Sequence, residues 1–171
     1  MKIYSSSIHN GYLDDKFGQR GTQFKKQKPS RSFHLAWSDL PEGTKTLALI
    51  FIDYDAIPVC GFPWIHWTVA NIDPTLNNLP ENASEDMNLI EGVTSWSSNL
   101  LPESMKLSKE DASGYGGCAP PDKNHLYTLY VYALDKKLAL DRGFYANELM
   151  HAMDGHVLER VKLTALYKTK N

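Results

Sequence analysis

The feature that most constrains the fold is an unbroken apolar run, Leu47 to Ile52, which stops at two carboxylates, Asp53 and Asp55. An apolar run this short is typical of a strand buried on both faces. If the chain stays extended through the acidic pair, both side chains point to the same side, because side chains alternate along a strand. The run therefore predicts a core strand whose end carries two acids to the edge of a sheet.

A second strand follows after a turn. Proline and glycine punctuate residues 58–63, which predicts a loop, and residues 65–71 alternate in the manner of a strand. The alternation places His66 on the face opposite Trp67. Two strands joined in this way can bring the imidazole of His66 to the point where the acids emerge.

The rest of the chain predicts further strands and one helix. Strands are expected at residues 2–5, 33–37, 127–134 and 163–167, and apolar spacings of three and four predict a helix over residues 146–161. Residues 73–117 lack periodicity and are expected to form a long surface loop. We therefore predict one domain, residues 1–171, that is mainly β: an antiparallel β-sandwich with a C-terminal helix and long surface loops.

The composition excludes several classes of function. The net charge of −2 and pI near 6.3 provide no basic surface for nucleic acid, and a basic cluster over residues 20–31 is interpreted as a solvated loop face. No apolar stretch is long enough to cross a membrane, and the N-terminus lacks the apolar core of a signal peptide. With two cysteines, a disulfide-rich scaffold is excluded. We expect a cytoplasmic protein with free thiols.

The segment from Gly114 to Pro121 is the second unusual stretch, because its glycines permit close backbone approach and its Pro-Pro pair forces an extended exit. His125 follows it and shares a strand face with Tyr127. Each histidine can be a buried core residue or part of a site, and each aspartate can serve only its turn. A zinc site from both histidines with Cys60 and Cys118 lacks the paired spacing of zinc motifs. No nucleotide-binding fingerprint is present, so no cofactor is expected.

Four motifs in this order resemble the phosphatidylethanolamine-binding protein family, in particular its bacterial branch of Raf-kinase-inhibitor-like proteins. They are Asp53 to Pro58, Trp64 to Trp67, Gly116 to Pro121, and His125 to Tyr127. The resemblance covers nearly the whole chain. It implies a β-sandwich, no enzymatic reaction, a possible protein partner, and the dimeric state common in bacterial relatives.

The resemblance also implies a small pocket for phosphate-like and carboxylate groups. By motif position its lining residues are Asp53, Asp55, Trp64, His66, Cys118, Ala119, Pro120, Pro121, His125 and Tyr127. Some motif positions depart from the family pattern. Leu126 stands where the family has arginine, which removes a bidentate anion partner. Tyr54 replaces a proline, Ile57 is an insertion, and Ala119 replaces a glycine.

These residues predict a non-enzymatic binding protein for phosphate, a phospholipid head group or a carboxylate. The nearby acids should raise the pKa of both His66 and His125, so that the two cations bond the ligand's oxygens, with Tyr127 as a further donor. Anion binding should then weaken between about pH 5.5 and 8. Two alternatives stay open: an acid/base hydrolase using Asp53 with His66 or His125, and an inhibitor-type protein whose partner inserts a side chain into the pocket.

Overall fold

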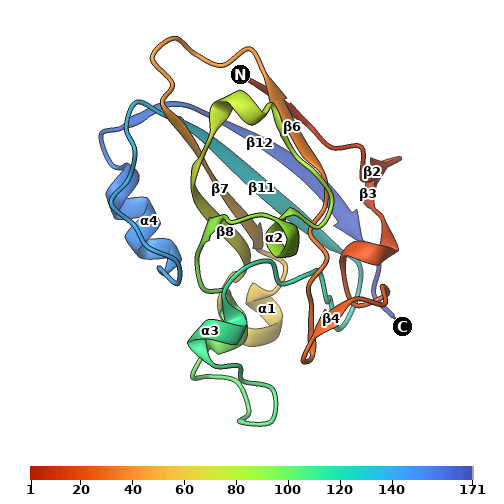
Figure 1. Ribbon diagram of the computed structural model, residues 1–171. Coiled ribbons are helices and arrows are strands. Elements are labelled where there is room, and N and C mark those ends of the chain that lie inside the picture. The colour runs from red at the N-terminus through yellow and green to blue at the C-terminus, as the bar shows by residue number, and fades with distance from the viewer. Residues whose placement is uncertain (171) are drawn as a thin grey trace.

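The chain folds around one large β-sheet, which a computed structural model describes for residues 1–170 (Figure 1). Seven strands form this sheet in the order β10-β8-β7-β11-β12-β3-β2. They span Ile90–Glu91, Trp64–Ile72, Thr46–Asp53, His125–Leu134, Val157–Tyr167, Tyr12–Leu13 and Ile8–His9. The protein is therefore mainly β, as predicted.

The expected antiparallel sandwich is confirmed only in part, because the large sheet is mixed and its partner layer is small. β12 pairs with β3 in parallel through Leu166 and Tyr12. The partner layer contains only three strands in the order β1-β6-β9, at Lys2–Tyr4, Leu35–Ser38 and Asn78–Leu79. A separate hairpin pairs β4 (Phe24–Lys25) with β5 (Lys28–Pro29).

Strand β7 forms the centre of the core, and every residue in it is buried. Leu47, Leu49 and Phe51 face the cluster shared with the three-stranded sheet, while Ala48, Ile50 and Ile52 face a second cluster under helix α4. The apolar run is continuous because both faces of the strand are covered. The prediction of a doubly buried strand is confirmed.

The late helix is shorter than predicted. Helix α4 spans Ala146–Met153, and Val157 and Val161 belong to β12 instead. Gly155 adopts φ 74°, a left-handed conformation that ends the helical path. The apolar residues between 146 and 161 therefore belong to two elements: the buried face of a helix up to Met153 and one face of a long strand from Val157. No helix within residues 1–170 has the length and apolarity to span a membrane.

The segment 73–117 runs over the surface as predicted, and short helices and strands interrupt it, which its sequence also allowed. These are η2 (Pro74–Leu76), α2 (Ala83–Asp86), η3 (Ser95–Ser97) and α3 (Lys109–Ala112), besides β9 and β10. Two other short helices, η1 (Asp15–Phe17) and α1 (Ile57–Cys60), lie elsewhere in the chain. In Figure 1 the turns around α3 lie next to α1, at the end of β7.

The hairpin β4–β5 fastens this segment. Lys26 pairs with Asp111 at 2.5 Å, and the Gln27 side-chain amide donates to the Met105 carbonyl at 2.6 Å. Lys28 is only 1% exposed and donates from Nζ to the Ser113 carbonyl. The interpretation of residues 20–31 as a solvated face is therefore wrong for Lys28, whose pKa burial lowers to about 8.

Candidate functional site

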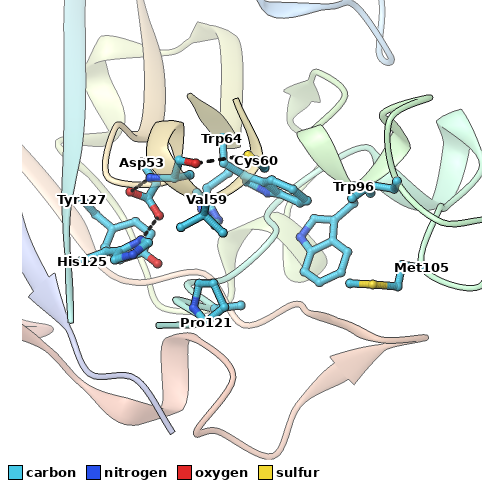
Figure 2. A pocket seen from close by; sticks show the side chains of 13 residues that line it. Asp53, Val59, Cys60, Trp64, Trp96, Met105, Pro121, His125 and Tyr127 are labelled. Atoms are coloured by element: carbon cyan, nitrogen blue, oxygen red, sulfur yellow. Dashed lines mark hydrogen bonds and ion pairs between the residues drawn. The ribbon is translucent and has the colours of Figure 1, made fainter. Parts of the chain in front are cut away.

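A cavity of about 270 Å³ opens where β7 ends and β8 and β11 begin. Helix α1, residues 96–105 and residues 119–121 complete its walls. Figure 2 shows Asp53, His125 and Tyr127 on one side, Trp96 with Met105 on the other, and Pro121 between them. Because β7 is antiparallel to both neighbours, the end of one strand and the starts of two others meet here.

Asp53 and His125 form the charged end of the cavity. Asp53 is 3% exposed; its Oδ1 accepts from the Ala56 amide at 3.2 Å, and its Oδ2 lies 2.7 Å from His125 Nδ1. On its other side His125 Nε2 donates to Asp122 Oδ1 at 2.8 Å. Burial lowers the pKa of His125, but hydrogen bonds to the two carboxylates outweigh burial and hold the pKa above 6.5. The ring is thus an imidazolium between two carboxylates.

His66 has the opposite character. Its Nδ1 donates to the Gly116 carbonyl at 2.6 Å, which leaves Nε2 as an acceptor without a partner among residues 1–170. Burial lowers the pKa of His66 despite the nearby charge of Asp53. The expectation of two cationic histidines is therefore correct in direction for His125 and wrong for His66. Nor is His125 free to bond a ligand, since carboxylates take both of its ring nitrogens.

Three further polar atoms of lining residues are buried without a hydrogen-bond partner in the described part of the chain. They are the Tyr127 hydroxyl and the indole nitrogens of Trp64 and Trp96. The two indoles meet edge to face with ring centroids 5.5 Å apart. Burial keeps Tyr127 in its protonated form by raising its pKa far above the usual 10. Residues that line the cavity therefore carry hydrogen-bond donors that the protein itself does not use.

Seven of the sequence-predicted residues line this cavity: Asp53, Trp64, His66, Ala119, Pro121, His125 and Tyr127. Three do not. Asp55 accepts the Leu126 amide at 2.8 Å and so caps the start of β11, the ordinary turn use of an aspartate. Cys118 is fully buried, and the Pro120 carbonyl accepts from the Gln19 side chain, so these two residues join residues 117–121 to the N-terminal segment.

Leu126 also lies away from the cavity. Its neighbours His125 and Tyr127 line the pocket, so alternation along β11 places Leu126 on the opposite sheet face, where it is exposed. The expected loss of a bidentate anion partner through Leu126 stays a prediction.

Sequence reasoning missed the apolar wall of the cavity. Its members are Ala56, Val59 and Cys60 from and just before α1, and Trp96, Leu101 and Met105 from the long segment. Trp96, Leu101 and Met105 were detectable only as scattered apolar residues in a stretch without periodicity. Both cysteines are free thiols, and no three metal-ligand side chains gather within residues 1–170.

The sequence of this chain is similar to those of several bacterial proteins. A protein of Bacillus subtilis, uncharacterized YxkA, is 45% identical over 170 residues, covering 97% of this chain and 98% of that protein. YbhB of Escherichia coli is 30% identical over 173 residues, covering 98% and 99%.

Two solved structures match along nearly the full length. A putative phosphatidylethanolamine-binding protein homologue from Chlamydia trachomatis superposes with a TM-score of 0.78 at 29% identity, covering 98% of this chain and 97% of that one. YbcL of E. coli, whose structure is presented as a member of the mammalian PEBP family, gives a TM-score of 0.75 at 26% identity, covering 99% and 98%. The family model for phosphatidylethanolamine-binding protein matches residues 4–168. The chain therefore belongs to the phosphatidylethanolamine-binding protein family.

Proposed function

We propose that this protein is a non-enzymatic binding protein in which the small pocket beside Asp53 and His125 takes an acidic group: a phosphate, a phospholipid head group or a carboxylate. The observation that carries the proposal is the set of unpaired donors on residues that line the cavity, Tyr127, Trp64 and Trp96. A buried donor without an acceptor is costly, and an oxygen-rich ligand group would satisfy it.

The charged end supports binding rather than acid/base chemistry. A general base needs a ring nitrogen free to take a proton, and both nitrogens of His125 donate to carboxylates instead. The Asp53 carboxylate is likewise occupied by His125 and the Ala56 amide. This arrangement favours a rigid wall over a catalytic pair of Asp53 with His125. The ring of His66 keeps a free Nε2, but its Nδ1 bonds the Gly116 carbonyl and not Asp53, so the geometry does not form an Asp53–His66 pair either.

The free thiols of Cys60 and Cys118 agree with the cytoplasmic location that we include in this proposal. A protein partner regulated by pocket occupancy, and a homodimer, remain predictions drawn from the family resemblance.

The four tryptophans offer a direct test by NMR. Inorganic phosphate, phosphoethanolamine or acetate should shift the indole N–H signals of Trp64 and Trp96. Those of Trp37 and Trp67 should stay nearly constant, because their indoles already bond the Pro74 carbonyl and the Glu91 carboxylate. Unmoved Trp64 and Trp96 signals with all three probes, or turnover of a phosphoester panel that His66→Asn abolishes, would overturn the proposal.

A further inference from the structure

The pocket offers one unpaired acceptor beside its unpaired donors. His66 Nε2 is a lone-pair acceptor because Nδ1 carries the proton that bonds Gly116. The Tyr127 ring lies 5.1 Å from the His66 ring, centroid to centroid, and its hydroxyl lacks an acceptor within residues 1–170. Figure 2 shows the nitrogen edge of Trp96 turned toward the side of the cavity that holds Asp53 and Tyr127. An acid group that keeps one proton, with one O–H and one bare oxygen, matches this set.

The charges in the pocket oppose a doubly charged ligand. Of the described residues that line the cavity, none is a lysine or arginine. The one cation is the His125 imidazolium, which already faces Asp53 and Asp122. A phosphate dianion would therefore meet neutral donors and a buried carboxylate, without an uncommitted positive charge to offset its desolvation. A group with one charge meets a smaller penalty, and one that takes up a proton on binding avoids most of it.

The remaining walls are apolar and the space is small. Trp64, Trp96, Leu101 and Met105 line the cavity. In Figure 2, Trp96 and Met105 lie across the cavity from the polar end, and Val59 lies between. A volume of about 270 Å³ falls just below the range of drug-sized ligand sites, about 300–1,000 Å³. The ligand body is thus compact and hydrophobic rather than a long chain or a sugar.

We propose that this pocket selects a small monocarboxylic acid with a compact apolar body, aromatic or branched, and holds it with one proton shared between the carboxyl group and His66 Nε2. This inference rests on the proposed acid-binding function and narrows it to one ligand class. The balance is simple: the ligand carboxylate, neutral His66 and one proton from solvent form the complex, and no covalent bond changes. The Tyr127 and Trp96 donors bond the second carboxyl oxygen.

Proton uptake makes the binding pH-dependent. The titratable groups facing His66 are Asp53 from β7 and His125 and Tyr127 from β11, and Cys118 lies beside Tyr127. Burial raises the pKa of Tyr127 and Cys118, so both stay neutral, while burial lowers the pKa of His66. Between the pKa of the free acid and alkaline pH, affinity should fall about tenfold per pH unit.

Titration calorimetry of the full chain tests this directly, with benzoate, inorganic phosphate and phosphoethanolamine as probes. Measurements in two buffers of different ionisation enthalpy give the number of protons taken up. We expect benzoate to bind at least about tenfold more tightly than either phosphate probe. Its binding should take up close to one proton at neutral pH.

Two conservative variants test the geometry. Tyr127→Phe and Trp96→Phe each remove one donor while keeping an aromatic ring, and each should weaken benzoate binding about fivefold. Tyr130→Phe, on the same strand but outside the cavity, is the matched control and should bind like the native chain. His66→Asn keeps a donor for Gly116 and should remove the proton uptake.

The outcomes separate this inference from the function on which it rests. Tighter binding of phosphate or phosphoethanolamine than of benzoate would overturn the monocarboxylic selectivity and leave the acid-binding function standing. Benzoate binding without proton uptake would overturn the role of His66. Failure of all three probes to bind would overturn the proposed function together with the inference.

Discussion

The Asp53–His125 pair gives the sharpest test of the site's electrostatics. Asp53→Asn keeps the side-chain volume and an oxygen for the Ala56 amide, but it removes the charge that faces His125 Nδ1 at 2.7 Å. A hydrogen bond between charged groups contributes about 1.5–3 kcal/mol. Since His125 keeps Asp122 on its other nitrogen, the loss should stay below the about 3–5 kcal/mol of a wholly orphaned buried charge. We expect the free energy of unfolding to fall by about 2 kcal/mol.

The loss of stability expected for Asp53→Asn should also depend on pH. The pKa of His125 is raised by folding, so its stabilising contribution is fully present below pH 6.5 and is lost as pH rises through the folded-state pKa. The deficit of Asp53→Asn should therefore be largest at about pH 5.5 and shrink by about pH 8.5. Urea unfolding followed by tryptophan fluorescence should show a midpoint lower by roughly 1 M at the acidic end.

Asp122→Asn is the matched control, because Asp122 bonds the other nitrogen of the same ring but is 51% exposed. Solvent screens this contact, so its removal should change stability far less than Asp53→Asn. Equal effects of the two substitutions would refute the reasoning. So would an Asp53→Asn deficit that grows with rising pH, since it would mean that His125 is neutral in the folded protein.

Three further predictions concern the rest of the chain. A thiol reagent should modify Cys60 in the native protein, while fully buried Cys118, whose pKa burial raises, should react only after unfolding; two rapidly reacting thiols would contradict the structure. Met153→Ala should lower the unfolding free energy by about 2–4 kcal/mol, because Met153 is buried where α4 packs on the sheet. Met150 is 59% exposed, so Met150→Ala should change the unfolding free energy by less than about 0.5 kcal/mol. Equal urea midpoints for the two variants would argue against the packing of α4 on the sheet. Gly18→Ala should sharply lower the thermal midpoint, because a Cβ there would overlap the Cys118 carbonyl and the Tyr167 ring; an unchanged midpoint would disprove that close approach.

Local patterns predicted much of the sheet and part of the site. The apolar run at residues 47–52 became β7, and alternation correctly placed Tyr127 on the face that lines the pocket. The predicted opposition of His66 and Trp67 is wrong, because β8 has a register irregularity at this point and both rings pack against the same core cluster. The helix predicted over residues 146–161 is too long because apolar spacings of 3.6 and of 2 residues overlap over a short stretch. Gly155 separates the helical part from the strand that follows it.

The sequence alone determined that this is a mainly β chain of the phosphatidylethanolamine-binding protein family, with Asp53, His66 and His125 at the ends of neighbouring strands. Only the tertiary structure decided their protonation, because a pKa depends on burial and on partners distant in the chain. His125 lies between two carboxylates and stays charged, whereas His66 faces a backbone carbonyl in a buried site and stays neutral. The apolar wall of the cavity could also not be predicted from the sequence. Trp96 and Met105 belong to the 73–117 segment, whose sequence shows no periodic signal, and only the folded chain brings them to the cavity.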